Sequence, residues 1–180
     1  MKQKWERETY GKSSHSWCLR ILHATLEDLD HFLRDIWLEC CGHLSQFRIG
    51  RDFFLCEGVD REWGELSMDI AVQNVAQPGL VFEHEYDFGS TTTLKLTFVS
   101  ARLGGSTDSE KIQLLARNIA PDLRCESCGR EATLFFSEDH TLLCDSCAEK
   151  YGDEEEWSLP VCNSPRTGVC GYGEDYWLRY

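Results

Sequence analysis

Four of the ten cysteines in this chain of 180 residues form two pairs of the type Cys-x-x-Cys. Cys125 pairs with Cys128, Cys144 pairs with Cys147, and fifteen residues separate the two pairs. Two cysteines at this spacing can turn so that both sulfurs face one point, and Zn²⁺ binds four thiolates in a tetrahedral shell. The spacing therefore predicts one zinc site. Because four thiolates fill the shell, we expect the zinc to be structural and not catalytic.

Two other interpretations of these cysteines are free thiols and a redox-active pair. Two correctly spaced pairs seldom arise by chance, and no βαβ unit surrounds either pair as it would in a thiol oxidoreductase. The neighbouring segments favour zinc: Gly129 lets the backbone leave the first turn, residues 133–136 and 141–143 can pair as a hairpin, and a short helix can begin at residues 148–151. This order is typical of zinc-ribbon and treble-clef modules, and it leaves His140 as a solvent-facing hairpin residue.

The other six cysteines are weaker candidates. Cys162 and Cys170 could hold a second metal, together or with His15 or His43, but their spacing matches no standard pair and favours ordinary thiols. The rest lie in or beside apolar stretches, where a buried thiol is the default interpretation: Cys18, Cys40, Cys41 and Cys56.

Four polar residues, Glu83, His84, Glu85 and Asp87, stand together in the segment 80–88. Carboxylates and a histidine can perform acid–base chemistry, so an enzyme is one hypothesis. A solvated face of an antiparallel sheet is the favoured one, because Glu83, Glu85 and Asp87 share one strand face. The chain has no glycine-rich phosphate loop, nucleophile elbow or His-Glu-x-x-His helix. The sequence therefore favours a binding protein over an enzyme.

The C-terminal tail combines turn residues with aromatic ones. It is either a partner-binding surface or a strap that docks onto the domain, and both interpretations stay open. The candidate partner-binding residues are Pro165, Arg166, Tyr172, Tyr176 and Trp177.

Several secondary-structure elements must position these residues. Residues 25–38 predict the main helix, with Thr25 as its N-cap and an apolar stripe along one face. Strands are predicted at 17–23, 43–49 and 53–56, and residues 68–75 suit a helix or a strand. Residues 80–88 and 91–102 predict a hairpin with Gly89-Ser90 as a two-residue loop. Residues 109–118 predict a short helix, and residues 1–14 are polar and expected to be frayed.

The formal net charge is −13, and it is concentrated towards the C-terminus. Residues 1–120 carry 18 acidic and 13 basic side chains, whereas residues 121–180 carry 13 and 5. Because nucleic-acid binding depends on Lys and Arg, this balance disfavours it and favours a protein partner. The N-terminus lacks the apolar core of a signal peptide and no stretch has the length of a membrane span, so we expect a cytoplasmic protein with reduced cysteines.

Three motifs resemble the plasmid pRiA4b ORF-3-like family, which also occurs among passenger proteins of insertion elements. They are TLEDLDHFLRDIW at 25–37, HLSQFRIG at 43–50 and VFEHEYDFG at 81–89, and the resemblance spans about residues 15–102. The run LPVCNSPRTGVCGYGEDY resembles tails of zinc-containing members. Ser90 stands where the family has an acidic residue, and the family's following tryptophan is absent from TTTLKL. The resemblance implies an α+β fold and no particular activity.

Together these observations predict an α+β protein with a mixed or antiparallel sheet, one main packed helix and a small zinc-binding module. The predicted domains are residues 15–120 and residues 121–180, the latter holding the zinc module and the aromatic tail. The predicted function is that of a zinc-containing intracellular binding or adaptor protein. The alternatives are a nucleic-acid-binding protein of a mobile-element-associated family and an enzyme that uses the 80–88 strand.

Overall fold

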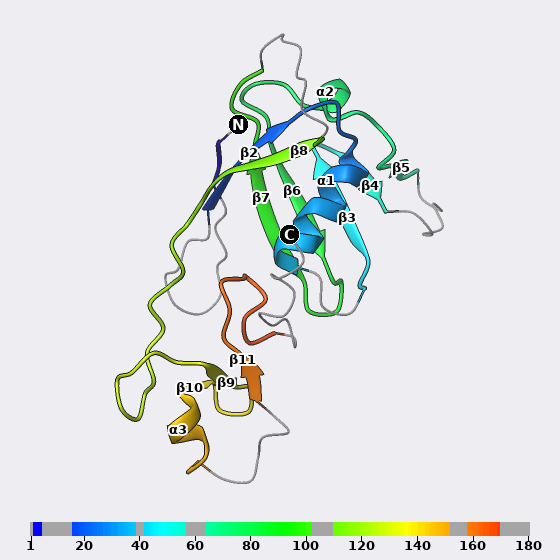
Figure 1. Cartoon of the computed structure of the whole chain (residues 1–180). Coiled ribbons are helices and arrows are strands. Elements are labelled where there is room, and N and C mark those ends of the chain that lie inside the picture. The colour runs from blue at the N-terminus through cyan, green and yellow to red at the C-terminus, as the bar shows by residue number, and fades with distance from the viewer. Residues whose placement is uncertain are drawn as a thin grey trace. The chain divides into compact units, whose positions relative to one another are not determined.

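The computed structural model describes residues 2–4, 16–38, 42–56, 64–101, 110–151 and 158–169. The chain divides into two compact units. Met1–Asp35 and Gly42–Asn118 form the first unit, and Ile36–Cys41 with Ile119–Tyr180 form the second. Figure 1 shows strands throughout and one main helix, α1 (Leu26–Leu33), so the predicted α+β class is confirmed.

The larger sheet of the first unit has five strands. Their order is β5 (Leu66–Ser67), β4 (Asp52–Leu55), β3 (Ser45–Ile49), β6 (Val81–Tyr86) and β7 (Thr92–Thr97). All neighbours are antiparallel except β4 and β5, so the sheet is mixed, as predicted. Alternation along the strands sends one set of side chains into the core: Phe47, Phe54, Phe82, Leu94 and Leu96 are buried.

A second sheet in the same unit joins β1 (Lys2–Lys4), β2 (Ser16–Ile21) and β8 (Ile112–Arg117), all antiparallel. It corrects two predictions. Residues 2–4 are a strand paired with β2, and most of the predicted helix at 109–118 is the strand β8. The short segment IQLLAR has no strong local preference, and hydrogen bonds to a strand about ninety residues earlier decide its conformation.

Helix α1 begins at the predicted N-cap. The amide of Asp28 donates to Oγ1 of Thr25, and the amide of Thr25 donates to Oδ2 of Asp28, which completes a capping box. The helix lies against β3 and β8, and its apolar side chains Leu26, Leu29 and Leu33 are buried. It continues as a π-helical turn, η1 (Arg34–Leu38), where the sequence predicted ordinary helix.

Two segments of the first unit differ from what the sequence predicted. Of residues 68–75, only the last four form a helix, α2 (Val72–Val75). The loop between β6 and β7 has five residues, because Tyr86 pairs with Thr92. Asp87 takes a positive φ of 62° there, and its Oδ1 accepts hydrogen bonds from the amides of Gly89 and Ser90. This side-chain turn replaces the predicted two-residue loop.

The second unit contains the predicted hairpin, formed by β9 (Leu134–Phe136) and β10 (Thr141–Leu143). A short helix, α3 (Asp145–Ala148), follows, three residues earlier than predicted. β11 (Ser158–Pro160), which the sequence did not predict, pairs with the other side of β9. Of the helices in the described residues, none has both the length and the apolar character that a membrane span needs.

Candidate metal centre

The first cysteine pair lies in a tight turn. The amide of Cys125 donates to the carbonyl of Arg130 at 2.7 Å, and the amide of Gly129 donates back to the carbonyl of Cys125 at 2.8 Å. Gly129 has a φ of 75°, a conformation that costs glycine least. This crossed pair of hydrogen bonds brings Cys125 and Cys128 to the same side of the turn.

The second pair lies at the start of α3. Cys144 is the last residue before the helix, directly after β10, and Cys147 lies within the first turn. The amides of Cys147 and Ala148 both donate to the carbonyl of Cys144 at 2.9 Å. One helical turn therefore places the two sulfurs on one side, and the β9–β10 hairpin carries them to the first pair.

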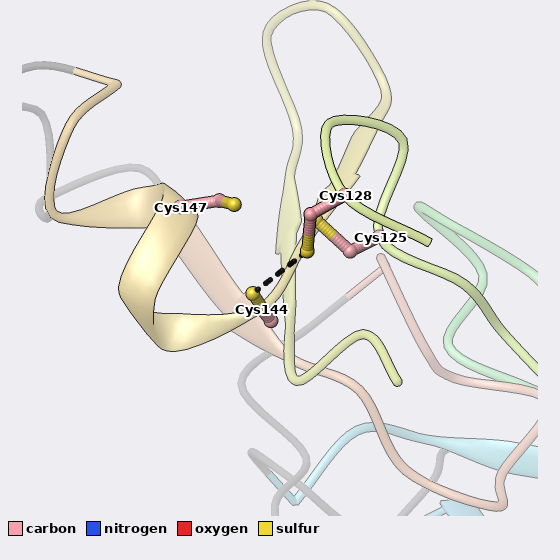
Figure 2. Close-up of side chains that lie close together, drawn as sticks. All are labelled: Cys125, Cys128, Cys144 and Cys147. Atoms are coloured by element: carbon pink, nitrogen blue, oxygen red, sulfur yellow. Dashed lines mark hydrogen bonds between the residues drawn. The ribbon is translucent and has the colours of Figure 1, made fainter. Parts of the chain in front are cut away.

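The four sulfurs meet at one place. Their ligand atoms all lie within 4.8 Å of one another, and Figure 2 shows them converging from the turn and from the end of β10 and α3. The Sγ atoms of Cys128 and Cys144 are 3.6 Å apart. A tetrahedral Zn²⁺ with sulfurs at about 2.3 Å requires them to be about 3.8 Å apart. The cysteine set therefore fits a zinc ion.

A neighbouring polar side chain favours the thiolate form of Cys128. Nε of Arg130 donates to Sγ of Cys128 at 3.3 Å, and this hydrogen bond is the main cause that lowers the pKa of Cys128 to about 6. Burial raises the pKa of Cys144 to about 11. A divalent cation would supply the charge that a buried thiolate at Cys144 needs, since metal ligation replaces the proton.

A small apolar cluster surrounds the cysteines. Phe136 and Leu143 are buried beside Cys125 and Cys144, and Leu134, Cys147 and Ala148 pack against this group. A core of this size cannot stabilise a module by itself, which is the common situation of structural metal sites.

Cys162 lies outside the metal cluster. Its buried Sγ is 3.3 Å from Oγ1 of Thr167, and its amide donates to the same oxygen. Among the described residues, the four cysteines above are the one group with metal-binding geometry. Cys170 lies outside the described residues, and so do His15, Cys40 and Cys41.

The predicted partner-binding residues divide into two groups. Pro165 and Arg166 are buried, Arg166 completely, so the structure does not place them on an exposed interface. They follow β11, which pairs with β9, and the amide of Val161 donates to the carbonyl of Thr133. Tyr172, Tyr176 and Trp177 lie outside the described residues.

Three residues of the predicted carboxylate–histidine cluster lie on β6, where His84 is on the opposite face from Glu83 and Glu85. Asp87 lies in the turn after the strand, so the prediction that it shares a strand face with Glu83 and Glu85 is wrong. Glu83 pairs with Arg48, and Glu85 accepts a hydrogen bond from Gln46 at 2.5 Å, both across to β3 on the outer face. His84 is completely buried on the inner face. The structure therefore does not bring these four side chains together in one cluster.

The sequence interpretation missed a buried hydrogen-bonded pair of polar side chains. Nε2 of His84 donates to Oδ1 of Asp30 on α1 at 2.6 Å, and both side chains have no exposed surface. A signal was available, because Asp30 stands one turn after Leu26 in the apolar stripe of the helix. His84 likewise alternates with the inward residues Phe82 and Tyr86.

Comparisons of the chain with protein-family models, with curated proteins and with solved structures gave no match.

Proposed function

We propose that this chain is a zinc-containing intracellular binding or adaptor protein, in which Cys125, Cys128, Cys144 and Cys147 hold one structural zinc ion. The convergence of their four ligand atoms within 4.8 Å carries the proposal. Zinc is favoured over other metals because a tetrahedral set of four thiolates suits it well. Thiolates of this kind persist in a reducing compartment, which supports a cytoplasmic location.

A binding role is favoured because a zinc ion with four protein ligands has no position for water or substrate. When bound, the ion would cross-link the two cysteine pairs. The partner would then bind to surface residues of the chain and not to the metal. Protein partners fit the acidic charge of the chain better than nucleic acid does. Nucleic-acid binding rests only on the resemblance of residues 15–102 to a family linked with mobile elements.

Metal analysis of the purified full-length chain tests the zinc site. We expect one zinc ion per chain and loss of that ion in Cys128→Ser and Cys144→Ser. Cys18→Ser is the matched control, because Cys18 is a half-buried thiol on β2 outside the cluster. Zinc-free preparations of the correctly folded wild-type chain would overturn the proposed site.

Affinity capture tests the binding role. Wild-type chain and the Cys18→Ser variant should recover the same partner protein, and Cys144→Ser should lose it. Salt titration with duplex DNA and RNA is the parallel measurement. Steeply salt-dependent, zinc-dependent binding of nucleic acid would favour the alternative function.

A further inference from the structure

The strand β9 lies between β10 and β11 in its sheet. It pairs with β10, which runs directly into Cys144, and with β11, which runs into residues 161–169. We call residues 158–169 the strap. The same short strand therefore contacts both the metal centre and the strap.

Thr133, the residue before β9, is hydrogen-bonded through its backbone to both β10 and the strap. The amide of Thr133 donates to the carbonyl of Leu143 on β10, and the carbonyl of Thr133 accepts from the amide of Val161 in the strap, both at 2.9 Å. Farther along, Gly168 lies against the ring of Phe135, where an added Cβ would come within 2.8 Å of that ring. The strap is thus fitted closely to β9 at both of its ends.

A residue in the middle of the strap is hydrogen-bonded to the turn η1, which follows α1. Oγ of Ser164 donates a buried hydrogen bond of 2.6 Å to the carbonyl of Trp37, in the turn η1. The strap's own turn positions this hydroxyl, because the amide of Arg166 donates to it at 3.0 Å and the amide of Ser164 donates to the carbonyl of Cys162. The last carbonyls of a helix have no partner within the helix, so Ser164 supplies one from outside.

We propose that zinc binding at the four cysteines stabilises the turn η1 through the strap, so that metal loading and the conformation of η1 are thermodynamically linked. This inference rests on the proposed zinc site. Without the metal, the three-residue strands β9 and β10 lack enough core to persist, so β11 loses the strand it pairs with. Ser164 then leaves the carbonyl of Trp37. By linkage, anything that holds η1 in place raises the affinity for zinc.

Hydrogen exchange on the full-length chain, with zinc and after removal of zinc by a chelator, tests the link. We expect the amides of β9, β10, the strap and η1 to lose protection together, while β6 and β7 keep theirs. Loss of protection in β9 and β10 with η1 unchanged would overturn the inference and leave the zinc site intact. Absence of zinc from the purified chain would overturn both.

A variant separates the strap contact from the metal. Ser164→Ala should retain one zinc ion and protection in β9 and β10, while exchange at η1 becomes faster on the order of fivefold, the effect of one lost hydrogen bond. Ser164→Thr keeps the hydroxyl and should restore slow exchange. Ser100→Ala, at an exposed serine of the first unit, is the matched control. Unchanged exchange at η1 in Ser164→Ala would overturn the inference.

Discussion

His84 on β6 and Asp30 on α1 form a hydrogen-bonded pair of 2.6 Å with no exposed surface on either side chain. Arg34, one turn further along the helix, approaches the other oxygen of Asp30 at 3.4 Å. The pair joins the main helix to a central strand of the five-stranded sheet. Because charges removed from water depend on their partners, the loss of either partner leaves a costly buried group.

Removal of the Asp30 carboxylate should destabilise the first unit strongly. We expect Asp30→Ala to lower the free energy of unfolding by about 3–5 kcal/mol, measured by denaturant titration. Glu83→Ala is the control, because it removes a solvent-exposed pair with Arg48 on the outer face of β6 and should cost less than about 1 kcal/mol. Equal losses in the two variants would contradict the structural role of the buried pair.

The pKa of Asp30 predicts a specific dependence of stability on pH. Burial raises this pKa, but the hydrogen bond and charge of His84, with Ser45 and Arg34, outweigh burial and hold it below its ordinary value. In the unfolded chain the carboxyl titrates near its ordinary pKa of about 3.9. The unfolded chain therefore binds more protons between the two values. The contribution of Asp30 is complete above about pH 4 and is lost as the pH falls through the folded-state pKa.

Unfolding titrations of wild type and Asp30→Asn between neutral pH and about pH 2 measure this contribution. The wild-type chain should lose more stability on acidification than Asp30→Asn, because asparagine does not titrate. The pKa of Asp28 is also lowered, but Asp28 is present in both proteins and cancels in the comparison. Parallel pH profiles would contradict the assignment.

The capping box at the start of α1 gives a second local prediction. Thr25→Ala removes the acceptor for the amide of Asp28 and should cost about 1 kcal/mol. Thr25→Ser keeps an oxygen at the same position and should restore most of the loss. Thermal unfolding of the three proteins checks this order, and an alanine variant as stable as the serine variant would refute the capping role.

Gly168 should be intolerant of a side chain for two separable reasons. Its φ is 75°, and a Cβ there would lie 2.8 Å from the ring of Phe135. Gly79 has a φ of 91° with nothing within 4 Å of such a Cβ, so Gly79→Ala measures backbone strain alone. We expect Gly168→Ala to cost an additional 1–3 kcal/mol or so from overpacking. Differential scanning calorimetry compares them, and similar losses would show that the strap adapts to the methyl group.

Features that depend on neighbours within a few residues were predictable from the order of the residues alone. The spacing within each Cys-x-x-Cys pair, the Thr25–Asp28 capping box and the alternation along 80–86 are local patterns, and the structure contains each of them. The hairpin between the cysteine pairs was predictable for the same reason. In each case a turn or a strand period decides which side chains share a face.

Features that depend on partners distant in sequence could not be predicted from local patterns. Residues 112–117 are a strand because β2 is available to pair with them, although their sequence predicted a helix. The alternation along β6 indicates that His84 points inward, but no local pattern indicates that its partner is Asp30, 54 residues away. Pro165 and Arg166 are buried in the segment that follows β11, and the partner of β11 is the distant strand β9. Long-range pairing and packing outweighed the weak local preferences of these segments, and they also connect the predicted zinc site to the turn at Trp37.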